Sequence, residues 1–251
     1  MLREINFKVF KKLLRKKKLK SITIDIDSSV VNVEGHQEGA VKGYNPKKLG
    51  NNCYNIQFAF CDEIKAFITG MVRSGDTYTA NCAAELIKEI MGYLNDEGLE
   101  ITFRMDSGYF DDKILETIES FGCTYVIKGK EYPTLVAQVS DPSVVFITGE
   151  EGRETTEFTT ALNIWDKARR FVLSRVLKDE KDRKQMSFLK GEEYDYFLLS
   201  PINRNCCQKK WFYFTKNAAM LKITSRKPSM IWLLDTSYSN PFGPTKPFFS
   251  L

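Results

Sequence analysis

Polar and apolar residues alternate in three segments near the start of the chain, as they do in half-buried strands. Ser21–Ile26 alternates toward an acidic end, so that Asp25 and Asp27 share one face and isoleucines occupy the other. Asn55–Cys61 and Lys65–Met71 have the same strand character and are separated by a short acidic turn. The pattern predicts one strand followed by a hairpin that lies beside it.

Helical spacing replaces this alternation from Thr79 to Leu94, where apolar residues recur every three or four positions. This segment predicts an amphipathic helix, with Thr79 and Asn81 as candidate N-terminal caps. A strand, a helix and another strand are predicted after it, at Glu100–Met105, Asp111–Ser120 and Thr124–Ile127. The order β-β-β-α-β-α-β is typical of a mixed α/β sheet covered by helices.

The remaining segments divide the chain into four parts. Residues 1–20 predict a basic amphipathic helix, suited to a surface or to a DNA-facing position, and residues 21–130 hold the sheet. Residues 131–197 predict a β-rich insertion without a long helix, with strand character at Ser143–Thr148, Glu157–Leu162 and Arg170–Val176. Residues 198–251 show neither strand nor helical periodicity and carry five of the eight prolines.

Composition excludes several classes of protein. The 251 residues are 43% hydrophobic, which is enough for a buried core, and no apolar run is long enough to span a membrane. Six cysteines lack Cys-x-x-Cys spacing, which argues against a disulfide framework or a zinc site. Of the charged residues, eight Lys or Arg and one acid lie in residues 198–251, which leaves 29 basic and 31 acidic residues before them. The net charge of +5 therefore identifies no partner by itself.

Two carboxylates are predicted at the ends of two different strands. Asp27 follows the first strand and Asp106 follows the strand at Glu100–Met105, each directly before a serine. Strand ends converge at one edge of an open sheet, and paired carboxylates there suit Mg²⁺ together with water and phosphate oxygens. An Asp-Ser pair after a strand is also common as a turn or helix cap, so the residues alone leave both interpretations open. His36, the only histidine, has no nucleophile with which to form a catalytic pair.

Four motifs lie along this part of the chain: IDIDSSV at Ile24–Val30, VxGxQEGAxxGYNP at Val33–Pro46, RxDSG at Arg104–Gly108 and YVIK at Tyr125–Lys128. Together they resemble the DDE transposases of the IS1380 group, which are related to the wider IS4 family. The resemblance extends from about Lys20 to Phe197. It implies a ribonuclease-H-like fold, with a mixed sheet flanked by helices and a β-rich insertion. It places the first acid of the family at Asp27 and the second at Asp106, with Asp25 as a reserve metal ligand.

The resemblance also implies an activity, which is metal-dependent nicking and strand transfer of DNA. Mg²⁺ or Mn²⁺ is the implied cofactor, and the implied partners are the terminal repeats of the element and target DNA, bound by a homodimer on paired ends. The implied location is the bacterial cytoplasm, at the nucleoid. Lys128, Lys130, Arg169 and Arg170 are the expected nucleic-acid contacts. Arg169 and Arg170 lie in the cationic segment Trp165–Arg175, which could follow phosphates. The same segment could equally be an exposed strand face.

The third acid of the family should follow the insertion, on a helix with the pattern Y-x-x-R-x-x-x-E-x-x-x-x-x-x-K, and no such pattern follows Phe197. The coding sequence after Phe197 can also be read in the frame that begins at the third base of each present codon. In that frame, codons that the genetic code allows for the present residues can encode YQKRCNAENYIKEAK. That reading has all four residues at the family spacing. We therefore hypothesise that a frame change near Phe197 replaced the native C-terminal helix and left an impaired copy without its third acid.

Two other functions remain open. One is a non-enzymatic fragment that binds DNA ends and interferes with transposition, and the other is a different nuclease of the same fold. A truncated gene is expected, because no end-recognition domain precedes Lys20. If the chain is active in spite of the missing acid, Glu192, Glu193 and Asp195 are the first substitutes to examine.

Overall fold

The computed structural model describes residues 2–35, 37–43, 50–130, 132–139, 141, 143–149, 153–163, 165–177 and 194–200. In chain order the elements are α1 (Leu2–Lys17), β1 (Ser21–Asn32), β2 (Val41–Lys42), β3 (Asn52–Cys61), β4 (Ala66–Ser74), α2 (Ala83–Leu94), η1 (Asn95–Glu97), β5 (Glu100–Met105), η2 (Ser107–Tyr109), α3 (Asp112–Ser120), β6 (Thr124–Lys128), α4 (Pro133–Val139), β7 (Ile147–Thr148), β8 (Glu154–Thr160), β9 (Arg169–Leu177) and β10 (Tyr194–Ser200). His36, Glu192, Glu193 and residues 201–251 lie outside the described residues. The predicted frame change near Phe197 is therefore not tested by the structure.

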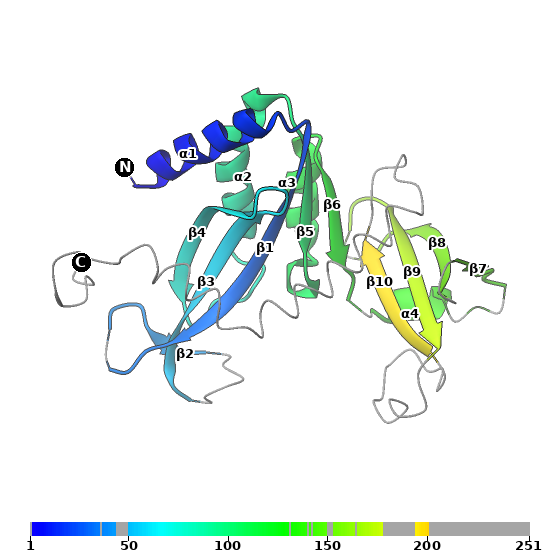
Figure 1. The fold of residues 1–251 in the computed structure, drawn as a ribbon. Coiled ribbons are helices and arrows are strands. Elements are labelled where there is room, and N and C mark those ends of the chain that lie inside the picture. The colour runs from blue at the N-terminus through cyan, green and yellow to red at the C-terminus, as the bar shows by residue number, and fades with distance from the viewer. Residues whose placement is uncertain are drawn as a thin grey trace. The chain divides into compact units, whose positions relative to one another are not determined.

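The central sheet has the strand order β4-β3-β1-β5-β6 (Figure 1). β3 runs antiparallel to β1 and β4, whereas β1, β5 and β6 run parallel to one another. In chain order these are the third, second, first, fourth and fifth long strands, which is the arrangement of a ribonuclease-H-like sheet. The predicted mixed sheet flanked by helices is confirmed.

Two helices cover one face of this sheet, because their apolar residues repeat at helical spacing. α2 and α3 pack against each other, and α2 buries Leu86, Ile87 and Ile90 completely. The isoleucines of β1 are also buried, at Ile22, Ile24 and Ile26, so they form the face that the helices cover. Burying each such side chain contributes about 1.5–3 kcal/mol. Asp25 and Asp27 alternate with them and lie on the opposite face.

α1 packs on this core instead of standing apart from it. Its apolar face is buried, and the ring of Phe7 stacks on Tyr93 with 3.8 Å between centroids. At its start, Asn6 donates a hydrogen bond to the carbonyl of Ile68 in β4, and Arg3 donates one of 2.9 Å to the carbonyl of Gly70. A free strand edge is a template for pairing with another chain. α1 therefore protects the β4 edge as well as closing the core.

β1 is longer than predicted, and this corrects the position of Asp27. Pairing with β3 continues through Asn32 and Cys53, so β1 does not end at Ile26. Its parallel pairing with β5, in contrast, ends at Ile26 and Met105. Asp27 therefore lies within a strand, at the point where one of its two neighbours stops.

α2 begins later than predicted, and neither predicted cap is used. The N-cap is Cys82, in a left-handed conformation with φ of 61° and without a side-chain cap. The segment before it is held by Arg73, whose guanidinium donates to the carbonyls of Tyr78, Thr79 and Asn81. Because these carbonyls bond to Arg73, Thr79 and Asn81 lie in the loop before α2 and not in its first turn.

The insertion extends the sheet beyond β6. β10 pairs antiparallel with both β6 and β9, and β8 and β7 follow outward from β9. The predicted strands Glu157–Leu162 and Arg170–Val176 correspond to β8 and β9, whereas Ser143–Thr148 is reduced to the two residues of β7. β10 crosses the predicted boundary at Phe197, so Leu198–Ser200 belong to the sheet. Within the described residues, every helix is too short or too polar to cross a lipid bilayer.

Candidate active site

The structure brings Asp27 and Asp106 to neighbouring positions. β1 and β5 are adjacent parallel strands whose last paired residues are Ile26 and Met105, so Asp27 and Asp106 are the next residue on each. The Oδ1 atom of Asp27 accepts a hydrogen bond of 2.7 Å from the amide of Ser28. The Oδ1 atom of Asp106 accepts one of 2.8 Å from the amide of Gly108, because Asp106 caps the short helix η2. A backbone amide orients each carboxylate.

The environment of Asp27 disfavours its negative charge. Burial raises the pKa of Asp27 to about 6, and the charges of Asp106 and Asp25 add to this, against the opposing effect of the Ser28 amide. The half-buried carboxylate of Asp27 therefore lies beside the exposed carboxylate of Asp106, whose charge repels it. A hard divalent cation, which prefers carboxylate oxygens, would relieve this repulsion. The donor set thus fits Mg²⁺ or Mn²⁺.

Asp25 has a different partner. It lies directly opposite Arg104 in the β1–β5 register, and Arg104 donates to both of its carboxylate oxygens, at 2.6 and 2.7 Å. Arg104 is 3% exposed and also lies 3.4 Å from a carboxylate oxygen of Asp62. The arginine engages both oxygens of Asp25, the residue predicted from the sequence as a reserve metal ligand, and this pair links β1 to β5.

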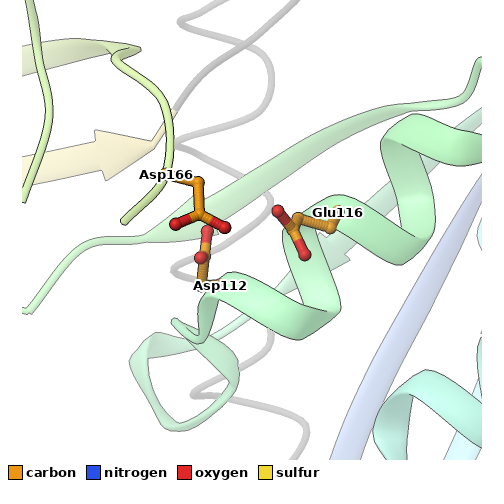
Figure 2. A group of neighbouring side chains, drawn as sticks. All are labelled: Asp112, Glu116 and Asp166. Atoms are coloured by element: carbon orange, nitrogen blue, oxygen red, sulfur yellow. The ribbon is translucent and has the colours of Figure 1, made fainter. Parts of the chain in front are cut away.

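A second group of carboxylates was not anticipated from the sequence. Asp112, Glu116 and Asp166 present ligand atoms that lie within 4.8 Å of one another. Figure 2 shows Asp112 and Glu116 on successive turns of α3, with the Asp166 carboxylate next to that of Asp112. The spacing of Asp112 and Glu116 is visible in the sequence, but Asp166 is fifty residues away and joins them only through the fold. Asp112 is already paired with Arg169, so this group is partly neutralised.

Arg169 and Arg170, expected to contact nucleic acid, have internal partners. Arg169 is 4% exposed, donates to Glu119 at 3.0 Å and also to Asp112, and its guanidinium lies 4.7 Å from the centre of the Trp165 ring. Arg170 is half-buried and pairs with Glu157 on the neighbouring strand. Lys130 is exposed and Lys128 is half-buried. Arg169 therefore joins the insertion to α3, and Lys130 is the expected contact that faces solvent.

Because Arg169 is buried and Lys130 is exposed, substitutions at the two positions are expected to differ in their effect on stability. Arg169→Met is expected to lower the free energy of unfolding by about 2 kcal/mol, since it removes charge-assisted hydrogen bonds. Lys130→Met is expected to leave stability unchanged, because this side chain is exposed. Urea denaturation measures both effects. Unchanged stability for Arg169→Met would contradict its structural role.

Comparison with known proteins identifies the family. A family profile described as transposase DDE domain group 1 matches residues 1–190. No curated protein matches the sequence. Among solved structures, a piggyBac transposase synaptic complex with hairpin DNA is similar at 14% identity and a TM-score of 0.43, over 74% of this chain and 35% of that one. The catalytic domain of Mos1 mariner transposase is similar at 11% identity and a TM-score of 0.30, over 49% of this chain and 57% of that one.

The chain thus spans about a third of the piggyBac transposase chain. The profile, in contrast, covers most of the present chain and includes α1, β1, both acid-bearing motifs and most of the insertion. On that match, this chain belongs to the family of transposase DDE domains, group 1.

Proposed function

We propose that this chain is the catalytic core of a DNA transposase of the IS1380 group, in which Asp27 and Asp106 hold Mg²⁺ or Mn²⁺. The observation that carries the proposal is the adjacency of these two acids at the end of the β1–β5 ladder, within the region that the family profile matches. Its substrates are the ends of its element and target DNA, bound in the bacterial cytoplasm by a homodimer. Lys128 is the last residue of β6, the exposed Lys130 follows this strand, and both are proposed to contact phosphates.

The residues of the chain have distinct tasks in this site. A bound divalent ion would stabilise the charge that develops on oxygen during phosphoryl transfer. Asp27 and Asp106 supply its oxygen ligands, oriented by the amides of Ser28 and Gly108. Arg104 neutralises Asp25, which would otherwise add a third negative charge to the same sheet face. The negative charge is therefore concentrated on the pair that meets the cation.

Within this proposal the chain is an impaired copy. A complete site of this family needs a third acid, and the expected Tyr-Arg-Glu-Lys pattern is readable only in another frame after Phe197. The family profile ends at residue 190, shortly before that point, which supports the interpretation. Determining the nucleotide sequence across the codons for Tyr194 to Ser200 tests it directly. A gene with no family-like coding in any other frame would overturn it.

Cleavage assays test the function. The chain as it stands is expected to show little or no Mg²⁺- or Mn²⁺-dependent cleavage of DNA carrying the element's ends, whereas a chain with the frame restored is expected to cleave them. In the restored chain, Asp27→Ala and Asp106→Ala should each lower the rate roughly 100- to 1000-fold, the range for losing a group that stabilises the transition state. Asp96→Ala, which removes an exposed acid from η1, is the matched control and should have no effect.

Three other outcomes are informative. Normal cleavage by the restored Asp27→Ala variant would refute the site. Strand transfer by the unaltered chain that Asp27→Ala abolishes would show that another acid replaces the missing one, with Glu192, Glu193 and Asp195 as first candidates. End binding without cleavage, even by the restored chain, would favour the non-enzymatic fragment.

A further inference from the structure

Tyr109 is a completely buried tyrosine three residues after Asp106. It ends the short helix η2, and its amide donates to the carbonyl of Asp106 at 3.2 Å. Its hydroxyl lies beside the side chains of Gln57 and Ser28 and interacts electrostatically with Asp27 and Arg73. The side chain therefore reaches from the loop that carries Asp106 to the strand that carries Asp27.

The polar atoms around this hydroxyl are unusual. Within the described part of the chain, the hydroxyl of Tyr109, Oε1 of Gln57 and Nε of Arg73 are buried without a partner that meets hydrogen-bond geometry. Leaving such a group unpaired is costly, so native structures rarely do so without a reason. The three groups are chemically complementary. Gln57 Oε1 is an acceptor beside the Tyr109 hydroxyl, which can donate its proton to it, and the Arg73 charge acts on the same hydroxyl.

The groups around the Tyr109 hydroxyl connect it to both acids, through Ser28 and Gln57 to Asp27 and through Arg73 to Asp106. Ser28 and Gln57 are direct partners in the β1–β3 register, so their side chains share the face opposite Asp27, and the amide of Ser28 holds the Asp27 carboxylate. Arg73 fixes the carbonyl of Thr79 at 3.0 Å. Thr79 packs so closely on Gly108 that a Cβ there would lie 2.8 Å from its methyl group. Gly108 in turn holds Asp106.

We propose that Tyr109 is a positioning residue that fixes Asp27 and Asp106 relative to each other, by joining Ser28 and Gln57 to the loop that carries Asp106. Phenylalanine would fill the same volume without the cost of a buried hydroxyl, so the hydroxyl itself must be what the site uses. That the positioned acids bind a metal ion rests on the proposed function. The link between the Asp27 strand and the Asp106 loop through Tyr109 does not depend on it.

Tyr109→Phe tests the link in two ways. Without metal, the amides of Ser28 and Gly108 are expected to exchange hydrogen about tenfold faster, because the two segments are no longer tied together. In Mn²⁺ titrations followed by electron paramagnetic resonance, affinity is expected to fall about 10- to 100-fold, as for other residues that support metal ligands. Gln57→Met removes the acceptor of the same link and should produce both changes.

Tyr125→Phe is the matched control. Tyr125 is also a buried tyrosine, but its hydroxyl donates to a different partner, Glu119 of α3, at 2.8 Å. Its loss should leave exchange at Ser28 and Gly108 and the Mn²⁺ affinity unchanged. Unaltered exchange at both amides in Tyr109→Phe would overturn the proposal. Faster exchange in Tyr109→Phe, with no Mn²⁺ binding by the unsubstituted chain, would instead refute the metal site and leave the link intact.

Discussion

Replacing Arg104 by methionine is expected to lower the free energy of unfolding by about 3–5 kcal/mol. Asp25 is 8% exposed in the unsubstituted chain, and the substitution removes the guanidinium that meets both of its carboxylate oxygens. A buried charge that has lost its partner keeps the full cost of its removal from water. Urea denaturation at neutral pH measures the loss as a lower midpoint with an unchanged slope.

Two further variants separate the ion pair from simple packing. Lys113→Met removes a surface pair, 3.7 Å long and exposed on both sides, and should change stability by about 0–1 kcal/mol. The double variant Asp25→Leu, Arg104→Met should recover most of the loss, because replacing a whole buried pair by apolar groups is often neutral. A double variant as unstable as Arg104→Met alone would show that the unpaired charge of Asp25 does not account for the loss of stability.

The order of the strands and helices could be predicted because local pattern and burial agree there. The alternating isoleucines of β1 and the helical spacing of Leu86, Ile87 and Ile90 each mark a face that the structure buries. Element ends were predicted less well, because they depend on distant partners. β1 continues to Asn32 only because β3 continues beside it, and α2 starts late because Arg73 captures the carbonyls before it.

The same distinction applies to the site. Asp27 and Asp106 were predicted from the family motifs that contain them, and their adjacency follows from the parallel β1–β5 register. The contacts of Asp25 and Arg169 could not be predicted, since Asp25 depends on a cross-strand partner and Arg169, in β9, on a partner in α3. Gln57 and Tyr109 gave no sequence signal at all. Each is an ordinary residue in an apolar pattern, and only complete burial of its polar atom makes it informative.

Asp27→Asn is expected to stabilise the protein at pH 7.5, even though it removes a proposed metal ligand. The pKa of Asp27 is about 6 in the folded chain and 3.8 ordinarily, so the folded state binds this proton more tightly than the unfolded state. The stability that this provides is present below about pH 4 and is lost as the pH rises through about 6. The difference corresponds to roughly 3 kcal/mol, and the asparagine variant does not lose it.

Urea denaturation of both proteins at pH 4.5 and 7.5 therefore gives a specific result. The stability of Asp27→Asn relative to the unsubstituted chain should rise by roughly 2–3 kcal/mol between the two pH values, whereas that of Asp96→Asn should stay constant. Mn²⁺ at 100 times its dissociation constant should then stabilise the unsubstituted chain at pH 7.5 by about 2.7 kcal/mol and leave Asp27→Asn unchanged. If the relative stability of Asp27→Asn is the same at both pH values, the carboxylate carries no burial cost. A cation would then relieve no repulsion at this position, and the proposed fit of Asp27 and Asp106 to a divalent metal would be refuted.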